Sequence, residues 1–477
     1  MTESCVAKSR KDNRPSGEGM CGAVFPPPAT GPRGFRASSA APERHGARTG
    51  QFGDPSRRRP AGEPSRAGVR AEPRMIRRVL LMWRQVSFWP RALRCVNGAV
   101  VAPGTSRIRS GTRSEPGRPV HRNGQRRPVQ GEAVSRVEPV LARALFRTPL
   151  LRLDVAHRGR VRRLGLKLES RGPTGSVKDR SAVGLLRALH DERPLTPGTV
   201  VVESTSGNLG LALARMLPGL GCDFLAVVDP KTPHTTRRML TDRGARVLVV
   251  DEPDGRGGYL LSRLRRVREL CADNPGYRWP DQYENWAAPD IHRRVTGPEL
   301  TGQAGADLGT VYVPVSTGGT LAGIGAHLRE HRPDVAAVAV DVRGSLAVAG
   351  SAGRRLIPGI GASRPSAFLA APHSYDRAVH VDDIEAIAVC RILVEDVGLA
   401  LGGSSGCAVR AMLTDREDDG PDDRLSVCLA ADGGGKYRDT LYSDDWATEQ
   451  GVAKEITSAV EHLRSEGLFF DRKHQEH

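Results

Sequence analysis

Short apolar runs alternate with helix-like segments over most of the chain after Val137. Strand-like runs lie at 165–169, 198–204, 222–229, 245–251, 309–316, 335–342 and 424–431. Helical patterns cover 177–190 and begin again at Gly207. Continuous apolar strands separated by helices are typical of parallel sheets that are covered on both faces. The pattern therefore predicts an α/β architecture.

Residues 1–135 lack this periodicity and are rich in Arg, Pro, Gly and Ser. Such a segment buries too little apolar surface to offset its conformational entropy, so we predict a disordered extension. Residues 75–93 form a basic, partly apolar stretch that has two interpretations. It is either a targeting or surface-binding helix or, as we favour, a transiently helical part of a disordered arm, since Arg-rich stretches match targeting patterns easily. A start of translation downstream of this stretch is a third interpretation.

The formal net charge of +17 is located entirely in this extension. Residues 1–135 contain 26 basic and 9 acidic residues, whereas the remaining chain contains 45 of each. The balanced part gives no electrostatic reason to expect nucleic-acid binding. A nucleic-acid-binding protein that acts through the basic arm stays open as an alternative of a different class.

Three parts of the chain are thus expected: the extension (1–135), one α/β domain (136–447) and a charged tail (448–477) with a helix near 456–463. The sequence contains no run of about 18 apolar residues, so we predict no membrane-spanning segment. The eight cysteines are scattered without metal-ligand spacing. They fit reduced thiols of a cytoplasmic protein with no metal site.

The segment Gly172–Arg180 (GPTGSVKDR) runs from a turn directly into a helix and places Lys178 near the helix N-terminus. The potential at a helix N-terminus and burial both lower the pKa of an amine. A lysine that forms an imine needs this shift, because only the neutral amine is nucleophilic. A surface lysine at a helix start is the alternative that this motif alone leaves open.

Two further loops join strand ends to helices. In 203–210 (ESTSGNLG), the backbone N–H groups and hydroxyls of Thr205, Ser206 and Gly207 suit a carboxylate, and the amide of Asn208 can bind a phenolic oxygen. In 316–320 (STGGT), paired glycines let the backbone approach a phosphate. Each loop alone is also compatible with an ordinary capped helix.

A fourth segment, 402–406 (GGSSG), follows an apolar helix and carries hydroxyls that can face a ring nitrogen. The four segments in this order resemble the fold-type II pyridoxal-phosphate (PLP) enzymes, the cysteine synthase and cystathionine β-synthase family. Further similar strings lie at 148–150, 281–285, 296–299 and 357–361, and the resemblance covers about residues 140–446. It implies a tryptophan synthase β-like fold with two α/β subdomains, PLP as cofactor, amino acids as substrates, a homodimer, and 136–447 as the catalytic domain.

The resemblance also implies roles for individual residues. Lys178 corresponds to the Schiff-base lysine and Asn208 to the partner of the cofactor's 3′-oxygen. The phosphate cradle corresponds to Ser316, Thr317, Gly318, Gly319 and Thr320. Ser404 corresponds to the partner of the pyridine nitrogen, with Ser405 as the alternative, and Thr205, Ser206, Gly207 and Asn208 to the substrate-carboxylate loop. The family often has glycine at position 316, and serine there would be strained if φ were positive.

Several strings, among them 357–363 and 432–446, are similar to the branch of this family that makes precursors of 2,3-diaminopropionate for siderophores and peptide antibiotics. This implies that O-phospho-L-serine and L-glutamate give N-(2-amino-2-carboxyethyl)-L-glutamate and phosphate. A cysteine synthase that uses O-acetylserine or O-phosphoserine with sulfide is the alternative, and an inactive PLP binder is disfavoured by Lys178. A phosphorylated substrate favours a nearby arginine, for which Arg237 and Arg343 are candidates unless both are surface residues.

Overall fold

The computed structural model describes residues 130–205, 207–255, 258–371, 373–415 and 423–472. The predicted extension, with its stretch at 75–93, lies outside the described residues except for its last part, where helix α2 (Gln130–Ala144) begins. The basic arm of the nucleic-acid alternative also lies outside them. Among the described residues, no helix is both long and apolar enough to cross a membrane.

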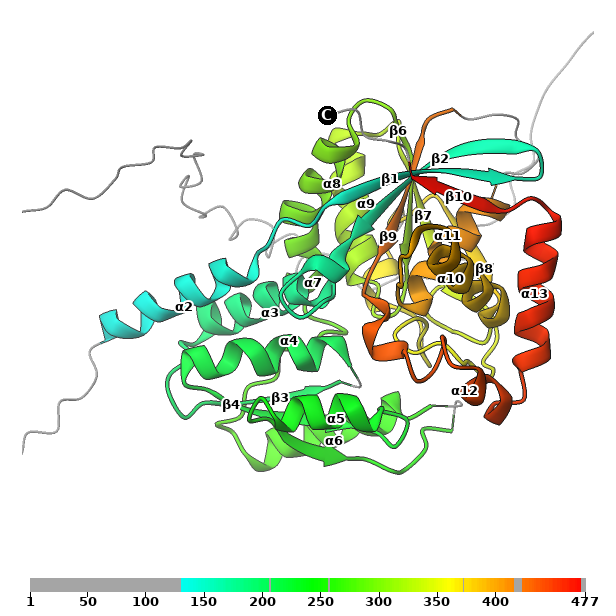
Figure 1. Ribbon diagram of the computed structural model, residues 1–477. Helices are drawn as coiled ribbons and strands as arrows, with labels where there is room; N and C mark the ends of the chain where they lie inside the picture. Colours follow the sequence, from blue (N-terminus) through cyan, green and yellow to red (C-terminus); the bar gives the residue numbers. More distant parts are fainter. Residues whose placement is uncertain (1–129, 206, 256–257, 372, 416–422, 473–477) are drawn as a thin grey trace, which may run out of the picture. The chain divides into compact units, whose positions relative to one another are not determined.

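Within the described residues, the larger of two sheets has seven strands in the order β10-β1-β2-β9-β6-β7-β8 (Figure 1). Its strands are β1 (Leu150–His157), β2 (Arg160–Leu168), β6 (Leu308–Pro314), β7 (Ala336–Val342), β8 (Arg377–Val381), β9 (Leu425–Ala430) and β10 (Phe469–Arg472). The run from β2 to β8 is parallel, whereas β1 pairs antiparallel with both β2 and β10.

The smaller sheet is entirely parallel, in the order β3-β4-β5. Its strands are β3 (Val200–Ser204), β4 (Asp223–Val228) and β5 (Arg246–Val249). Every strand-like run predicted from the sequence is found in one of the two sheets. The predicted fold, two α/β subdomains with mainly parallel sheets, is therefore confirmed.

Helices cover the sheets. They are α3 (Lys178–Glu192), α4 (Asn208–Met216), α5 (His234–Thr241), α6 (Leu260–Asp273), α7 (Ala287–Ile291), α8 (Gly297–Ala304), α9 (Gly319–His331), α10 (Asp383–Val397), α11 (Gly403–Thr414), α12 (Asp444–Glu449) and α13 (Ala453–Ser465). Strand β7 shows why the central runs are continuously apolar. Val338 and Val340 pack in the core with α10 and α11, while Ala337 and Ala339 pack in a second core with α9. Both faces of this strand are buried, as expected for a parallel sheet between two helical layers.

The charged tail (448–477) contributes to this architecture. Strand β10 pairs with β1 in register Val155↔Phe470, and Phe470 is fully buried. Helix α13 places Ile456 and Leu463 in the core that contains α10. The chain as far as Arg472 therefore completes one edge of the larger sheet.

Candidate active site

The candidate site is a pocket where the carboxyl ends of β6 and β9 meet the N-terminal ends of α3, α4, α9 and α11. Its walls are formed by Val177, Lys178, Asn208, Pro314, Ser316, Thr317, Gly318, Thr320, Gly359, Ser404, Leu429, Ala431 and Asp432. The carboxyl ends of parallel strands lie at the same edge of a sheet, where ligands of α/β proteins bind. The structure thus brings together residues from all four segments that the sequence analysis selects.

Lys178 is the first residue of α3, directly after the turn 172–177. Gly175 in this turn has φ of 80°, a left-handed conformation that glycine adopts without steric cost. The amide of Val177 donates to the carbonyl of Ala431 at 2.8 Å. The turn is thereby tied to the end of β9, and this contact fixes the position from which the Lys178 side chain enters the pocket.

The amine of Lys178 is withdrawn from water. Burial lowers its pKa to about 8, although the carboxyl of Glu203 opposes the shift. At pH 7 about a tenth of such amines are neutral, compared with fewer than about one in a thousand for an ordinary lysine. Its Nζ lies 3.5 Å from Thr317 Oγ1. The pocket therefore holds a lysine that is suited to nucleophilic and general-base chemistry.

The loop 316–320 has the geometry of an anion cradle. Gly318, with φ of +88°, is the N-cap of α9, and the helix begins at Gly319, which is not itself a wall residue. The first N–H groups of a helix lack intrahelical partners and favour phosphate. Ser316 has no positive φ, so serine in this position is not strained. Its hydroxyl donates to the carbonyl of Gly361 at 3.2 Å.

Asn208, the first residue of α4, belongs to a polar network that crosses the pocket wall. Its Nδ2 donates to Asp432 Oδ2 at 2.8 Å, and its Oδ1 contacts the ammonium of Lys436. Lys436 Nζ also lies 2.7 Å from Asp432 Oδ2, to which the Tyr437 hydroxyl donates at 2.7 Å. Neither Asp432 nor Lys436 was predicted from the sequence to be a site residue. A signal for Asp432 was present, because this residue directly follows the predicted strand 424–431 at the edge where the other site residues lie.

Thr205 and Gly207, two other residues of the predicted carboxylate loop, do not line the pocket. Thr205 is buried, and its hydroxyl accepts from the amide of Gly210 at 2.9 Å, which caps the first turn of α4. Gly207 is the N-cap of this helix in an extended conformation. Ser206 lies outside the described residues. Of the described residues of this loop, Asn208 alone lines the pocket, so the substrate role of the loop stays a prediction.

On α11 the structure distinguishes the two adjacent serines. Both serines are buried, but Ser404 is a wall residue and Ser405 is not. The phosphate-binding candidates Arg237 and Arg343 are also absent from the wall residues, and Arg343 is exposed. The geometry therefore favours Ser404 over Ser405 and supports neither arginine.

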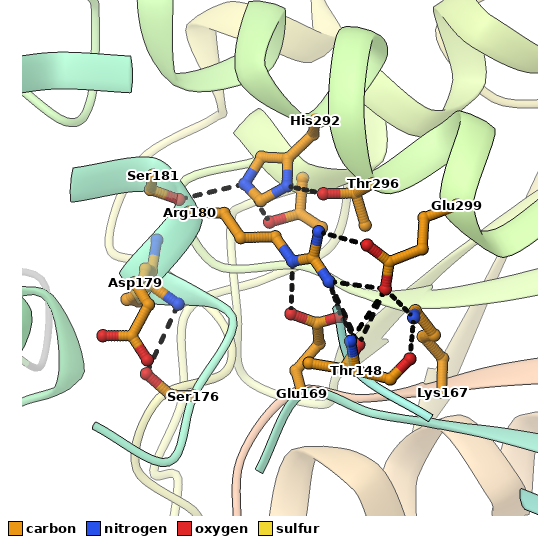
Figure 2. Close-up of polar contacts among 12 residues, drawn as sticks. Thr148, Lys167, Glu169, Ser176, Asp179, Arg180, Ser181, His292, Thr296 and Glu299 are labelled. Carbon is orange, nitrogen blue, oxygen red and sulfur yellow. Dashed lines mark hydrogen bonds and ion pairs between the residues drawn. The ribbon is translucent and has the colours of Figure 1, made fainter. Parts of the chain in front are cut away.

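A buried ionic network lies behind the start of α3 (Figure 2). Arg180 donates to Glu169 at 2.8 Å and to Glu299 at 2.9 Å, and Glu299 also accepts from Lys167 and from the amide of Thr148. Burial alone would raise the pKa of Glu299, but hydrogen bonds from Arg180 and Lys167 lower it to about 2. The network joins β2, α3 and α8 behind Lys178, which explains the strings at 148–150 and 296–299 structurally.

Two more buried ionisable groups are His292 and Glu203. Neither was predicted from the sequence to have a role. His292 Nε2 lies 3.0 Å from Ser181 Oγ and 3.3 Å from Thr320 Oγ1, so it links α3 to the cradle. Burial, and after it the charges of Arg180 and Lys178, hold the pKa of His292 well below its usual value.

Glu203 is fully buried at the end of β3. Its carboxyl group accepts a hydrogen bond from the amide of Ser204 at 2.8 Å and from Trp279 Nε1 at 3.3 Å. Burial raises the pKa of Glu203 to about 8.

Comparison with known proteins adds family information to this geometry. A model of the family described as pyridoxal-phosphate dependent enzyme matches residues 141–431. An N-(2-amino-2-carboxyethyl)-L-glutamate synthase from Ralstonia nicotianae is 38% identical over 332 residues, which cover 67% of this chain and 95% of that protein.

Solved structures show the same similarity. A hydrogen sulfide-producing enzyme from Fusobacterium nucleatum is 27% identical with a TM-score of 0.59, covering 69% of this chain and 96% of that one. An O-ureido-L-serine synthase is 28% identical with a TM-score of 0.57, covering 65% of this chain and 98% of the other.

Proposed function

The chain belongs to the pyridoxal-phosphate-dependent enzyme family, and we propose that it joins O-phospho-L-serine to L-glutamate. Its similarity to these synthases indicates a β-replacement enzyme of the cysteine synthase-like type. The observation that supports the specific substrates is the 38% identity over 95% of a synthase whose product is N-(2-amino-2-carboxyethyl)-L-glutamate.

The residues of the pocket fit the cofactor. Lys178, with its lowered pKa, would hold it through a covalent bond from the ε-nitrogen. The N-terminus of α9 and the loop 316–320 would bind its phosphate. Asn208 would donate to its 3′-oxygen, and Ser404 would face its ring nitrogen as a neutral partner. When bound, the cofactor withdraws electrons from the substrate's Cα, which weakens the bonds to that carbon.

The chain's own groups would then bind the substrate and move protons. We assign the substrate carboxylate to Thr205, Ser206, Gly207 and Asn208 at the start of α4, where backbone N–H groups and the helix dipole favour an anion. Once the substrate's amine has replaced Lys178 on the cofactor, the freed neutral amine of Lys178 would take the proton from Cα and later return it. In the net reaction the bond between Cβ and the phosphate oxygen breaks, and a bond from Cβ to the glutamate nitrogen forms. Inorganic phosphate leaves with the electron pair, and the glutamate nitrogen loses one proton.

A second candidate is β-replacement with sulfide, the cysteine synthase reaction that the family resemblance also implies; the similar hydrogen sulfide-producing enzyme handles sulfide as a product. Purified protein loaded with PLP should be given O-phosphoserine or O-acetylserine, each with glutamate, with sulfide or with neither, and the products identified by mass spectrometry. The proposal predicts N-(2-amino-2-carboxyethyl)-L-glutamate and one phosphate per product in the glutamate reaction. Cysteine as the only product across the panel would support the sulfide reaction instead. O-acetylserine as the only productive donor would contradict the phosphorylated substrate.

We further propose that the enzyme is a homodimer, as the family resemblance implies. Size-exclusion chromatography with light scattering tests this directly. A mass twice that of the chain supports the dimer, and a monomer mass at all concentrations contradicts it.

A further inference from the structure

Asp432 is the acidic residue of the pocket wall, and its contacts are unusual for a group so far from water. The residue is 2% exposed. Its Oδ2 accepts from Asn208 Nδ2 at 2.8 Å, from Tyr437 at 2.7 Å and from Lys436 at 2.7 Å. Its Oδ1 is buried and has no hydrogen-bond partner within the part of the chain that the structure describes. A buried carboxylate is costly unless it is paired, so this arrangement requires Lys436.

The amide of Asn208 is held between these two charges. Its Nδ2 donates to the carboxylate of Asp432, and its Oδ1 contacts the ammonium of Lys436. The two charges fix which end of the amide carries nitrogen. They also polarise it in the same direction, since an anion at the N–H and a cation at the C=O both favour the charge-separated form of the amide. An Nδ2 group has two hydrogens, and Asp432 uses one of them.

We propose that Asp432 and Lys436 are positioning residues that turn the second N–H of Asn208 into a strong, fixed donor toward the cofactor's 3′-oxygen. This inference rests on the proposed function, because it assumes that the pocket holds PLP and that Asn208 faces that oxygen. The consequence is that the electron distribution of the bound cofactor depends on a carboxylate that acts only through Asn208.

The test compares Asp432→Asn with wild type in the PLP-loaded protein, using the visible absorption spectrum and the dissociation constant of PLP. Asp439→Asn is the matched control, because Asp439 lies exposed on the same loop. The Asp432→Asn variant should shift the visible band and weaken PLP binding by about fivefold, the difference between a charge-assisted and a neutral hydrogen bond. The double variant Asp432→Asn/Lys436→Met, which removes both charges and leaves no unpaired buried ion, should shift the band in the same direction and provides a second readout if Asp432→Asn folds poorly.

The decisive step is a double-mutant cycle with Asn208→Ala. If Asp432 acts through Asn208, then adding Asp432→Asn to Asn208→Ala should change neither the band nor the PLP affinity further. Equal effects of Asp432→Asn in both backgrounds would overturn the inference, as would a spectrum identical to that of wild type and Asp439→Asn. A colourless wild type that binds no PLP would instead overturn the proposed function itself.

Discussion

Replacing Gly318 by alanine should destabilise the 316–320 loop and lower the affinity of the protein for the cofactor. Gly318 has φ of +88°, and a Cβ added there would lie 2.1 Å from Ser366 Oγ and 2.9 Å from Ser366 Cβ. Ser366 cannot simply rotate away without cost, because its hydroxyl donates to the carbonyl of Thr317 at 2.7 Å. The loop must therefore move if alanine is to be accommodated.

The structure separates the expected cost into two parts. A non-glycine residue in the left-handed region costs about 1–3 kcal/mol. Overpacking against Ser366 costs a further amount of about 1–3 kcal/mol. Gly319 provides the control, since a Cβ there would meet its nearest atom, Ala288 Cβ, at 3.5 Å, an ordinary contact. Gly319→Ala is expected to leave stability unchanged or to raise it slightly, because alanine is favoured over glycine in a helix.

The assay is thermal unfolding with and without PLP, together with a PLP titration of the apoprotein. Gly318→Ala should lower Tm and raise the Kd for PLP, whereas Gly319→Ala should leave Tm unchanged or slightly raised. Adding Ser366→Gly to Gly318→Ala removes the contacts with Ser366 and should recover part of the loss, leaving the backbone cost and a tight contact with Leu369 Cγ at 3.0 Å. If Gly318→Ala unfolds and binds PLP like Gly319→Ala, the reasoning about this loop is refuted.

Three further predictions concern the buried ionisable groups. Because burial lowers the pKa of Lys178 to about 8, the rate at which apoprotein incorporates PLP should rise with pH to a midpoint near 8 in stopped-flow absorbance, and a midpoint typical of an exposed lysine would contradict this. Because burial raises the pKa of Glu203 to about 8, the folded chain keeps a proton that the unfolded chain releases at about pH 4–5. Wild type should therefore lose stability relative to Glu203→Gln as pH rises from about 5 to 8, and parallel curves of Tm against pH would argue against a raised pKa. Glu299→Gln removes one of the carboxylates that neutralise the buried side chains of Arg180 and Lys167. In urea unfolding it should lower the free energy of unfolding by about 3–5 kcal/mol. A decrease below about 1 kcal/mol would show that the network is dispensable.

The central strands could be predicted from the sequence because burial on both faces makes them continuously apolar. Strand β7 is the clearest case, with alternate residues in two different cores. Strands β1 and β10 were not predicted because they form the partly polar edge of the sheet, and β10 is only four residues long. Strand β8 was not predicted for similar reasons, since it is short and carries Arg377 and His380.

The candidate site was predictable as far as local chemistry reveals it. Glycines and hydroxyls at strand ends mark the cradle and the start of α4, and a lysine after a turn marks the start of α3. The contact of Asn208 with Asp432 joins residues 224 positions apart, and local patterns carry no information about such a contact. Burial raises the pKa of Glu203, and a hydrogen bond from Trp279, 76 positions away, opposes the shift; both effects appear only in the folded chain.

The account depends most directly on the identity of the lysine that carries the cofactor. PLP-loaded protein should be reduced with borohydride, digested and mapped by mass spectrometry. Because Lys436 is paired with Asp432 while the amine of Lys178 has a lowered pKa, the pyridoxyl group is expected on Lys178 alone. Label on Lys436, on Lys167 or on no lysine at all would contradict the assignment of the site.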